Sequence, residues 1–246
     1  MSRVVLHAFS ISNFSEKGRA LLAFKRIEYE IRHHLVGLPQ RRLVALSGQR
    51  KVPVIEHAGR VVSDSTRIAH YLDDAFPDRP RLVPEDEPRR SRVLALEDEI
   101  DETLGIGAPV LWFDDVVRGR RADEMELLAT EVHGLSARGA RWFGGGLAMA
   151  RALGIGERFV RTRGERARAL LARLADRLAA TRYLVGDTPT LADVAAAGLT
   201  LHLEWPFLPH LPAAVPRGRG VAGIVDAPEL RRFFAWRRTF YEQYLG

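Results

Sequence analysis

The period of the hydrophobic residues changes once along this chain of 246 residues, at a segment between residues 77 and 88. Before it, short apolar runs alternate with helical patterns. After it, apolar residues recur three and four positions apart, as on one face of a helix. The segment itself holds four prolines and many charges, a composition typical of a linker. The chain is therefore expected to form two domains, residues 1–80 and residues 89–246.

The first 80 residues predict the order βαβαββα. Such an order favours a small mixed sheet with helices on both sides. Each expected strand is a short apolar or alternating run, and each expected helix has one apolar face. The strands are expected at residues 3–9, 29–35, 52–55 and 60–62, and the helices at 13–25, 39–46 and 65–76.

Residues 89–246 predict an all-helical domain. Apolar residues from Val93 to Leu104 mark one helix, which Pro109 and its neighbouring glycines are expected to kink or end. Cap residues open two later helices, Thr190 with Asp193 and Asp226 with Glu229. Two more helices are expected at 124–132 and 167–178, and flexible connectors at 144–146 and 212–223.

Composition narrows the class of protein. With 46% apolar and 28% charged residues, the chain reads as soluble and globular. No apolar run is long enough to span a membrane, and the N-terminus carries no export signal. The absence of cysteine excludes disulfides, thiolate metal sites and any mechanism in which the protein supplies a sulfur nucleophile. A cytoplasmic protein fits these limits.

The net charge of +6 raises the question of nucleic-acid binding. The arginines are mixed with acidic residues along the expected helices, and no basic and aromatic residues are interleaved, so we interpret them as solvated helix faces. Residues 1–80 carry 13 basic and 8 acidic side chains, whereas residues 81–246 carry 24 and 23. The first domain is therefore the better candidate for binding an anionic small molecule, and no nucleic-acid partner is expected.

The junction between the first strand and the first helix, residues 10–19, is rich in serine. Asn13 followed by Glu16 predicts a capping box, so the helix is expected to begin there. Ser12 would then lie just outside a helix N-terminus, where free N–H groups and the helix dipole favour an anion such as a thiolate. Taken alone, the stretch favours the simpler interpretation that Ser12 and Ser15 are capping or turn residues.

Three motifs lie in the two halves of the chain. In the first half, Pro53 enters a strand and the acid–serine pair Asp64-Ser65 follows eleven positions later, before an apolar helix, while Ser12-x-Phe14 lies before the first helix. In the second half, the stretch Gly186 to Asp193 ends in the threonine and aspartate that open a helix. Together they resemble the cytosolic glutathione transferase family, whose buried capping motif is similar to Gly186 to Asp193. Ser12-x-Phe14 resembles the serine-type members of the tau, theta and zeta kind, whereas cysteine-type members carry Cys in place of this serine.

The resemblance implies a thioredoxin-like N-terminal domain that binds glutathione and a helical bundle that contributes the electrophile pocket. Ser12, with Ser15 as second choice, would donate a hydrogen bond to the glutathione thiolate. A cis Pro53 would turn the backbone of Val52 toward the cysteinyl part of the ligand. The γ-glutamyl ammonium and carboxylate and the glycyl carboxylate would be bound, in that order, by Asp64, Ser65 and Lys51.

The second substrate is less well defined by the sequence. Trp112 and Phe113 are the chosen candidates for an apolar pocket beside the sulfur, although aromatic residues in a helical domain also serve as core. Arg67 stands where the family usually has a small residue, and both a dimer interface and the ligand are open as its partner. Other members of the aromatic set are Trp142, Trp205 and Phe207.

The leading hypothesis is an enzyme that activates the glutathione thiol for attack on an apolar electrophile, with lyase or isomerase variants included. The alternative is a non-catalytic thiol-binding or regulatory module with the same fold. The resemblance also implies a cytoplasmic homodimer acting in detoxification, with glutathione as co-substrate and no metal. Another low-molecular-weight thiol is an open possibility for such an arginine-rich chain.

Overall fold

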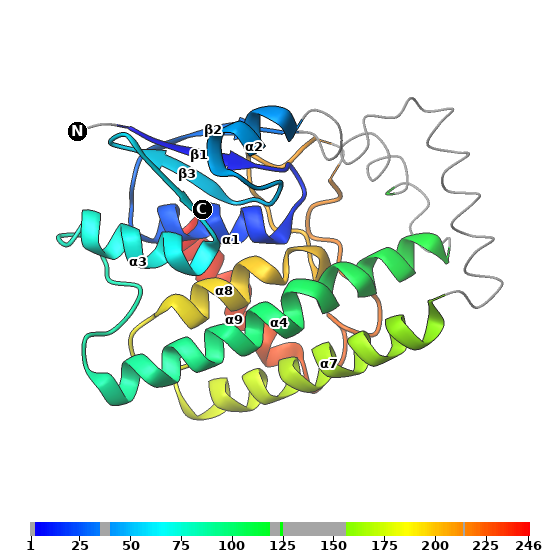
Figure 1. Cartoon of the computed structure of the whole chain (residues 1–246). Helices are drawn as coiled ribbons and strands as arrows, with labels where there is room; N and C mark the ends of the chain where they lie inside the picture. The colour runs from blue at the N-terminus through cyan, green and yellow to red at the C-terminus, as the bar shows by residue number, and fades with distance from the viewer. Residues whose placement is uncertain (1–2, 35–39, 119–123, 125–155, 214) are drawn as a thin grey trace.

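The computed structural model describes residues 3–34, 40–118, 124, 156–213 and 215–246 (Figure 1). The N-terminal part is a four-stranded sheet with helices on both faces. Its strand order is β2-β1-β3-β4, with β1 parallel to β2 and the other pairs antiparallel. The predicted order βαβαββα is confirmed. The strands are β1 (Val4–Ala8), β2 (Tyr29–His33), β3 (Val54–His57) and β4 (Arg60–Ser63).

Two of the three helices in this part lie between the sheet and the helical domain. Figure 1 shows α1 and α3 on that side and α2 on the opposite face of the sheet. The helix α2 ends at Gly48, which has a φ of 73° in the left-handed region that glycine adopts without strain, as the sequence predicts. The helices are α1 (Asn13–Phe24), α2 (Arg41–Ser47) and α3 (Ser65–Ala75).

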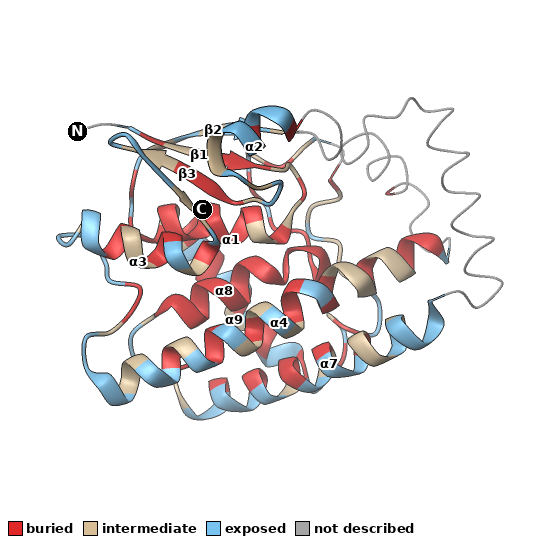
Figure 2. Cartoon of the chain, in the orientation of Figure 1, coloured by how far each residue is buried: buried red, intermediate tan, exposed pale blue. Residues whose placement is uncertain are grey.

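The C-terminal part is built of helices joined by turns in its described residues. Its centre is α8, a helix of mostly alanine and other small apolar residues, all of which are buried (Figure 2). This helix packs against α1 on one side and α4 on the other, and α7 packs along α4. The elements are α4 (Glu87–Val117), α7 (Glu157–Ala180), α8 (Leu191–Leu199), a 3₁₀ turn η3 (Leu201–Leu203), α9 (Arg231–Phe240) and a π turn η4 (Tyr241–Leu245).

The sequence left open whether Pro109 kinks or ends its helix. The helix α4 does not end there but continues to Val117, with buried residues on both sides of the proline. One predicted helix start is wrong. The last helix begins at Arg231 and not at Asp226, whose carboxylate instead accepts a hydrogen bond from the backbone N–H of Gly223 at 2.6 Å. The capping box of Thr190 and Asp193 is confirmed at the start of α8.

The other expectations for this part divide between described and undescribed residues. The expected helix at 167–178 lies inside α7. The described residues of 212–223 form turns that pair with the chain around Trp205, whose N–H donates to the carbonyl of Arg219 at 3.1 Å. The expected helix at 124–132, apart from Glu124, and the connector at 144–146 lie outside the described residues. No helix among the described residues is long and apolar enough to cross a membrane.

Candidate active site

The sheet register brings three separate segments to one edge of the N-terminal domain. His7 of β1 pairs with Val54 of β3, so the chain that leaves β1 lies beside the residues just before Val54. Val54 also pairs with Ser63, so the residues after β4 lie on the other side of the same segment. The junction around Ser12, the Val52-Pro53 pair and the start of α3 are therefore neighbours.

The peptide bond between Val52 and Pro53 is cis, which confirms the expectation drawn from the resemblance. Val52 precedes β3, whose pairing with both neighbouring strands begins at Val54. Pro53 packs directly on α1 at Gly18, where a Cβ atom would lie 2.7 Å from the Cβ of Pro53. A glycine at this position is what allows α1 to approach the proline so closely.

The start of α3 combines a cap with a left-handed residue. Asp64 has a φ of 79°, and its Oδ1 accepts hydrogen bonds from the backbone N–H groups of Thr66 and Arg67, both at 3.1 Å. Both bonds end on the same oxygen, so Oδ2 of this exposed residue is left as an acceptor for a ligand. Ser65 follows as the first residue of α3 and is buried.

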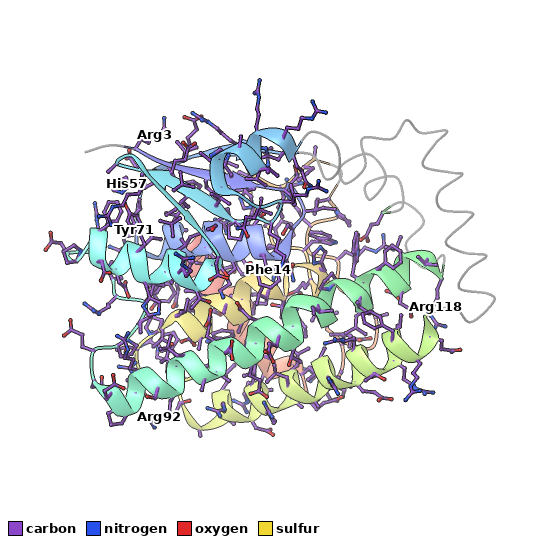
Figure 3. The ribbon with its side chains drawn as sticks, in the orientation of Figure 1. Arg3, Phe14, His57, Tyr71, Arg92 and Arg118 are labelled. Carbon is purple, nitrogen blue, oxygen red and sulfur yellow. The ribbon has the colours of Figure 1, made fainter. Side chains whose placement is uncertain are left out.

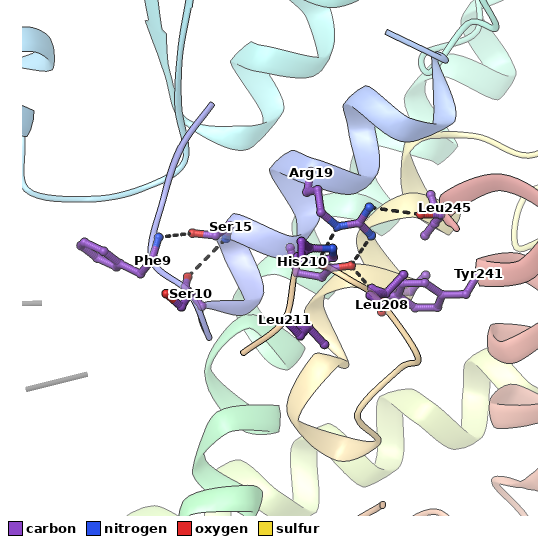
Figure 4. Close-up of polar contacts among 12 residues, drawn as sticks. Phe9, Ser10, Ser15, Arg19, Leu208, His210, Leu211, Tyr241 and Leu245 are labelled. Atoms are coloured by element: carbon purple, nitrogen blue, oxygen red, sulfur yellow. Dashed lines mark hydrogen bonds and ion pairs between the residues drawn. The ribbon is translucent and has the colours of Figure 1, made fainter. Parts of the chain in front are cut away.

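The start of α1 is capped by Ser12 itself. Its Oγ accepts a hydrogen bond from the N–H of Ser15 at 3.2 Å. The Oγ of Ser15 accepts one from the N–H of Phe9 at 3.0 Å (Figure 4). Each hydroxyl still has its own proton to donate. Because Ser12 is half-buried and Ser15 is buried, Ser12 is the better placed donor toward a ligand.

The predicted capping box of Asn13 and Glu16 is wrong. The cap lies one residue earlier because the helical domain uses both side chains. The amide nitrogen of Asn13 donates to the carbonyls of Gly105 and Leu199 at 3.1 and 3.2 Å. Glu16 instead accepts two hydrogen bonds from Arg19, at 2.9 and 2.6 Å.

Glu16 is the centre of a buried network that the sequence did not reveal. Figure 4 labels its partners Arg19, His210 and Tyr241. His210 bonds to its Oε2 and the hydroxyl of Tyr241 donates to its Oε1, both at 3.0 Å. Burial alone would raise the pKa of Glu16, but Arg19 and the hydrogen bonds from Arg19 and His210 outweigh burial and lower it from 4.5 to about 2. Arg19 also donates to the carbonyl of Leu245 at 3.1 Å, so the network joins α1 to the C-terminal turn.

A second buried cluster lies where α1, α3 and α4 meet. Lys17 is fully buried, and its Nζ lies 2.5 Å from Glu97 and 2.6 Å from Asp101. The hydroxyl of Thr66 donates to the same oxygen of Glu97 at 2.6 Å. Burial raises the pKa of Asp101 to about 6 despite the opposing effect of Lys17, and the charge of nearby Asp64 adds to the increase. The cluster therefore borders the residues proposed for the γ-glutamyl group.

The remaining predicted site residues are Lys51, Arg67, Trp112 and Phe113, and each is described by its exposure and neighbours. Lys51 and Arg67 are exposed near the same edge. Trp112 is buried in the helical domain, where its ring lies 5.0 Å from that of His202 and 5.7 Å from that of Trp205. Trp112 thus packs in the interior of the helical domain, while Phe113 is half-buried, and the assignment of both to the electrophile pocket stays a prediction.

Phe14 is an aromatic residue that contacts both domains at the site (Figure 3). A Cβ atom at Gly105 of α4 would lie 2.6 Å from its ring, so Phe14 packs directly on α4. Phe207 is 78% exposed, and Trp142 lies outside the described residues. The burial of Phe14 against a glycine in another helix is a tertiary feature that sequence periodicity does not signal.

Two family models match the chain, one in each domain. Residues 6–80 match the N-terminal domain of glutathione S-transferase, and residues 157–235 match its C-terminal domain. Among curated proteins, a probable glutathione S-transferase GSTU1 of Oryza sativa subsp. japonica is 43% identical over 82 residues, which are 33% of this chain and 36% of that protein. Glutathione S-transferase U10 of Arabidopsis thaliana is 32% identical over 93 residues, 37% of this chain and 40% of that protein. The chain thus matches little more than a third of the length of these relatives.

Solved structures extend the likeness to the whole fold. Rice GST1 in complex with glutathione has a TM-score of 0.62 at 23% identity and covers 98% of this chain and 86% of its own. The beta-etherase LigF from Sphingobium sp. strain SYK-6 has a TM-score of 0.59 at 20% identity and covers 94% and 98%. Because the two domain models together match more than half of the chain and the fold agrees over nearly all of it, the chain belongs to the glutathione S-transferase family.

Proposed function

We propose that this protein is a glutathione transferase that ionises the glutathione thiol beside Ser12 and directs it at a small apolar electrophile. The observation that carries the proposal is the sheet register, which places Ser12, the Val52 backbone before a cis proline, and Asp64-Ser65 along one edge. Family membership supports the same ligand and reaction. Detoxification in the cytoplasm as a homodimer is proposed on family membership alone.

Each part of glutathione has a matching group along this edge. The Val52 backbone, free of the strand pairing that begins at Val54, suits the cysteinyl N–H and C=O. The second carboxylate oxygen of Asp64 suits the γ-glutamyl ammonium, and Ser65 at the N-terminus of α3 suits the γ-glutamyl carboxylate. Lys51 is an exposed cation for the glycyl carboxylate. The peptide is thus held as an added strand with its thiol toward α1.

One hydrogen bond from Ser12 and the N-terminus of α1 are together sufficient to ionise the glutathione thiol at neutral pH. A free thiol with a pKa of about 8.5 is only a few per cent ionised at pH 7. Lowering that pKa by about two requires roughly 2.7 kcal/mol. A hydrogen bond to a charged group contributes about 1.5–3 kcal/mol, and the N-terminus of α1 adds about 0.3–2 kcal/mol. No general base is required, so Ser12 acts as a donor to sulfur and not as a nucleophile.

The thiolate then attacks the electrophilic carbon of the second substrate. In a transfer reaction the new C–S bond forms as the bond to the leaving group breaks, and the leaving group departs with that electron pair. The thiol proton has already passed to solvent. Lyase and isomerase variants begin with the same thiolate. Phe14 and Phe113 are the half-buried aromatic residues proposed to contact the apolar part of the substrate.

An ultraviolet titration of the bound thiolate tests this proposal. In the wild-type complex we expect a thiol pKa below that of free glutathione. Ser12→Ala should raise it by about one to two, which corresponds to the loss of one charged hydrogen bond of about 1.5–3 kcal/mol. Ser12→Thr keeps the hydroxyl and should restore the low value.

Ser15→Ala is the matched control for this titration. It removes the acceptor of the Phe9 N–H and should lower the free energy of unfolding by about 1 kcal/mol, without changing the thiol pKa. Bound glutathione that titrates like the free peptide in the wild type would favour the non-catalytic binding module. A larger effect of Ser15→Ala than of Ser12→Ala on the thiol pKa would transfer the donor role to Ser15.

A further inference from the structure

Three polar side chains form a chain of hydrogen bonds across the sheet, on the face that α2 covers. Leu6 of β1 lies against Gly18 of α1, so the next residue, His7, points to the opposite face. The ring of His7 bonds through Nδ1 to Nε2 of His34 at 2.8 Å and through Nε2 to Oε1 of Glu56 at 2.7 Å. His34 follows β2 and Glu56 is in β3, so the chain of bonds crosses three strands.

The carboxylate of Glu56 fixes a proton on His7. Nη1 of Arg32 lies 3.5 Å from the same Oε1 that His7 contacts. At neutral pH a glutamate beside an arginine is ionised and only accepts hydrogen bonds, so Nε2 of His7 is the donor in this contact. His7 is buried, and its other nitrogen is left to face His34.

The contact between the two imidazole rings has room for one added proton and not for two. With both rings neutral, Nε2 of His34 donates to Nδ1 of His7. With one added proton, His7 is the cation and its Nδ1 donates to Nε2 of His34. A second proton would place two N–H donors 2.8 Å apart and remove the hydrogen bond. The pair can therefore accept its first proton in place and its second only by separating.

The surroundings of His34 also oppose a second proton. Burial lowers the pKa of His34 below its ordinary value, and the basic groups His7, His33 and Arg42 lower it further. The two glutamates nearby are both within ion-pair distance of Arg32. The titratable and charged groups on the elements packed around His34 are His7 of β1, Glu30, Arg32 and His33 of β2, Glu56 of β3 and Arg42 of α2.

His34 lies at the end of an edge strand. In the described sheet β2 is bonded to β1 alone, and its pairing ends where His33 lies opposite Ala8. The backbone N–H of His34 then donates to the carbonyl of Ala8 at 2.9 Å. Because an edge strand has one neighbour, its contacts with β1 are what hold this end of β2 in place.

We propose that the pair of His7 and His34 is an acid-sensitive link that holds the end of the edge strand β2 on β1. At neutral pH the rings stay bonded. In acid the second proton separates the rings, and the end of β2 opens. The unfolded chain takes up protons on both histidines, whereas the folded pair takes up one. This part of the stability is therefore present above about pH 6.5 and is lost as pH falls below it. The link does not depend on the proposed thiol chemistry.

Nitrogen-15 spectra of the imidazole rings in the intact protein test the proton count. We expect His34 to stay neutral in the folded protein at pH 5.5, where an ordinary histidine is about nine-tenths cationic. Folded protein in which both His7 and His34 are cationic at this pH would overturn the proposal.

Urea unfolding of matched glutamine variants tests the effect on stability. His34→Gln keeps a donor and an acceptor near the position of Nε2 but takes up no proton. Between pH 7.5 and pH 5.5 the unfolding constant of the wild type should rise about tenfold more than that of His34→Gln. His70→Gln, on α3, removes a histidine outside the pair and should follow the wild type. Equal pH dependence of the wild type and His34→Gln would overturn the link.

Hydrogen exchange locates the opening. After correction for intrinsic exchange rates, the opening constant at the amide of His34 should rise about tenfold between pH 7.5 and pH 5.5. The amides that pair β3 with β4, such as those of Ile55 and Val62, should change less, and so should position 34 in His34→Gln. An equal rise across the whole sheet would place the acid-sensitive group elsewhere and overturn the proposal. Glutathione titrations of the same variants at pH 7.5 report on the proposed function separately.

Discussion

Asp64 combines two tasks at one position. Its carboxylate caps α3 through Oδ1 while its backbone is left-handed, with a φ of 79°. Aspartate and asparagine are the residues other than glycine that adopt this conformation most readily. The negative charge is not needed for either task, since any oxygen acceptor could cap the helix. The charge is therefore the part of this residue that we assign to the ligand.

Asp64→Asn separates the cap from the charge. Because the amide oxygen can still accept from Thr66 and Arg67, we expect the free energy of unfolding to change by less than about 1 kcal/mol. Glutathione affinity, measured by calorimetry, should fall at least about tenfold with the loss of a charged hydrogen bond. Asp86→Asn, at the cap of α4, is the control and should leave affinity unchanged. Wild-type affinity in Asp64→Asn would show that the ammonium is bound elsewhere.

Glu16 makes stability depend on acid pH. Its pKa of about 2 in the folded protein lies below the ordinary 4.5, so its contribution is present above pH 4.5 and is lost as pH falls toward 2. The difference corresponds to about 3 kcal/mol. In urea unfolding between pH 5 and pH 2, the wild type should lose stability more steeply than Glu16→Gln. Glu87→Gln, an exposed glutamate in the first turn of α4, should follow the wild type. Parallel curves for Glu16→Gln and the wild type would contradict this assignment.

At the scale of elements, close helix contacts at glycine set the geometry of the site. Gly18 of α1 faces Pro53, and Gly198 of α8 faces the backbone of Lys17, where a Cβ atom would lie 2.9 Å from the Cα of Lys17. The first contact brings α1 to the start of β3, and the second brings α1 to the helical domain. Because Gly18 and Gly198 have no side chain, α1, which carries Ser12 at its N-terminus, lies close to both the start of β3 and α8.

Gly18→Ala should push α1 away from the start of β3. The new Cβ meets a rigid proline ring, so we expect a loss of about 1–3 kcal/mol in the free energy of unfolding and weaker glutathione binding. Gly105→Ala is the matched comparison, because both positions are helical and gain equally in helix propensity. There the new Cβ meets the ring of Phe14, which is half-buried and able to move, so the loss should be smaller. Denaturant unfolding of both variants measures the difference, and equal losses would argue against the rigid contact at Pro53.

Across the whole molecule, buried charges join the two domains. Lys17 in the N-terminal domain is paired with Glu97 and Asp101 in α4, and Glu16 is bonded to Tyr241 in the C-terminal turn. Both pairs come from the first two turns of α1. The helix that presents Ser12 is therefore held by the helical domain as firmly as by its own sheet, which couples the thiol site to the relative position of the domains.

Lys17→Met leaves two carboxylates without their buried cation. We expect it to lower the free energy of unfolding by about 3–5 kcal/mol, because the remaining charge is uncompensated. The double variant Lys17→Met with Glu97→Gln should recover part of that loss. Arg32→Met is the control: it breaks solvent-accessible pairs with Glu30 and Glu56, and it should cost less than about 1 kcal/mol. Urea unfolding of the three variants measures these differences, and a loss in Lys17→Met no larger than in Arg32→Met would refute the interdomain role.

The sequence by itself determined the order of the elements, the position of the cis proline motif and the capping box that opens α8. These features depend on residues close together in the chain: alternating or helical apolar periods, a glycine after α2, and Thr190 with Asp193 three residues later. The candidate residues were chosen from the resemblance to the glutathione transferase family, and only the register of the folded sheet brings them to one edge.

The tertiary structure alone decided the cap of α1, the length of α4 and the partners of the buried charges. The local sequence predicts a cap at Asn13, but its amide nitrogen donates to carbonyls in α4 and α8. Ser12 caps α1 instead. Local rules allow Pro109 either to kink or to end its helix, and packing against α7 and α8 decides that α4 continues. Lys17 is paired with Glu97, which is 80 residues further along the chain, and Glu16 is bonded to Tyr241, which is 225 residues further along. No short-range sequence pattern encodes such pairs. Only the packing of whole domains removes these charges from water, and a buried charge is then stable only beside its partner.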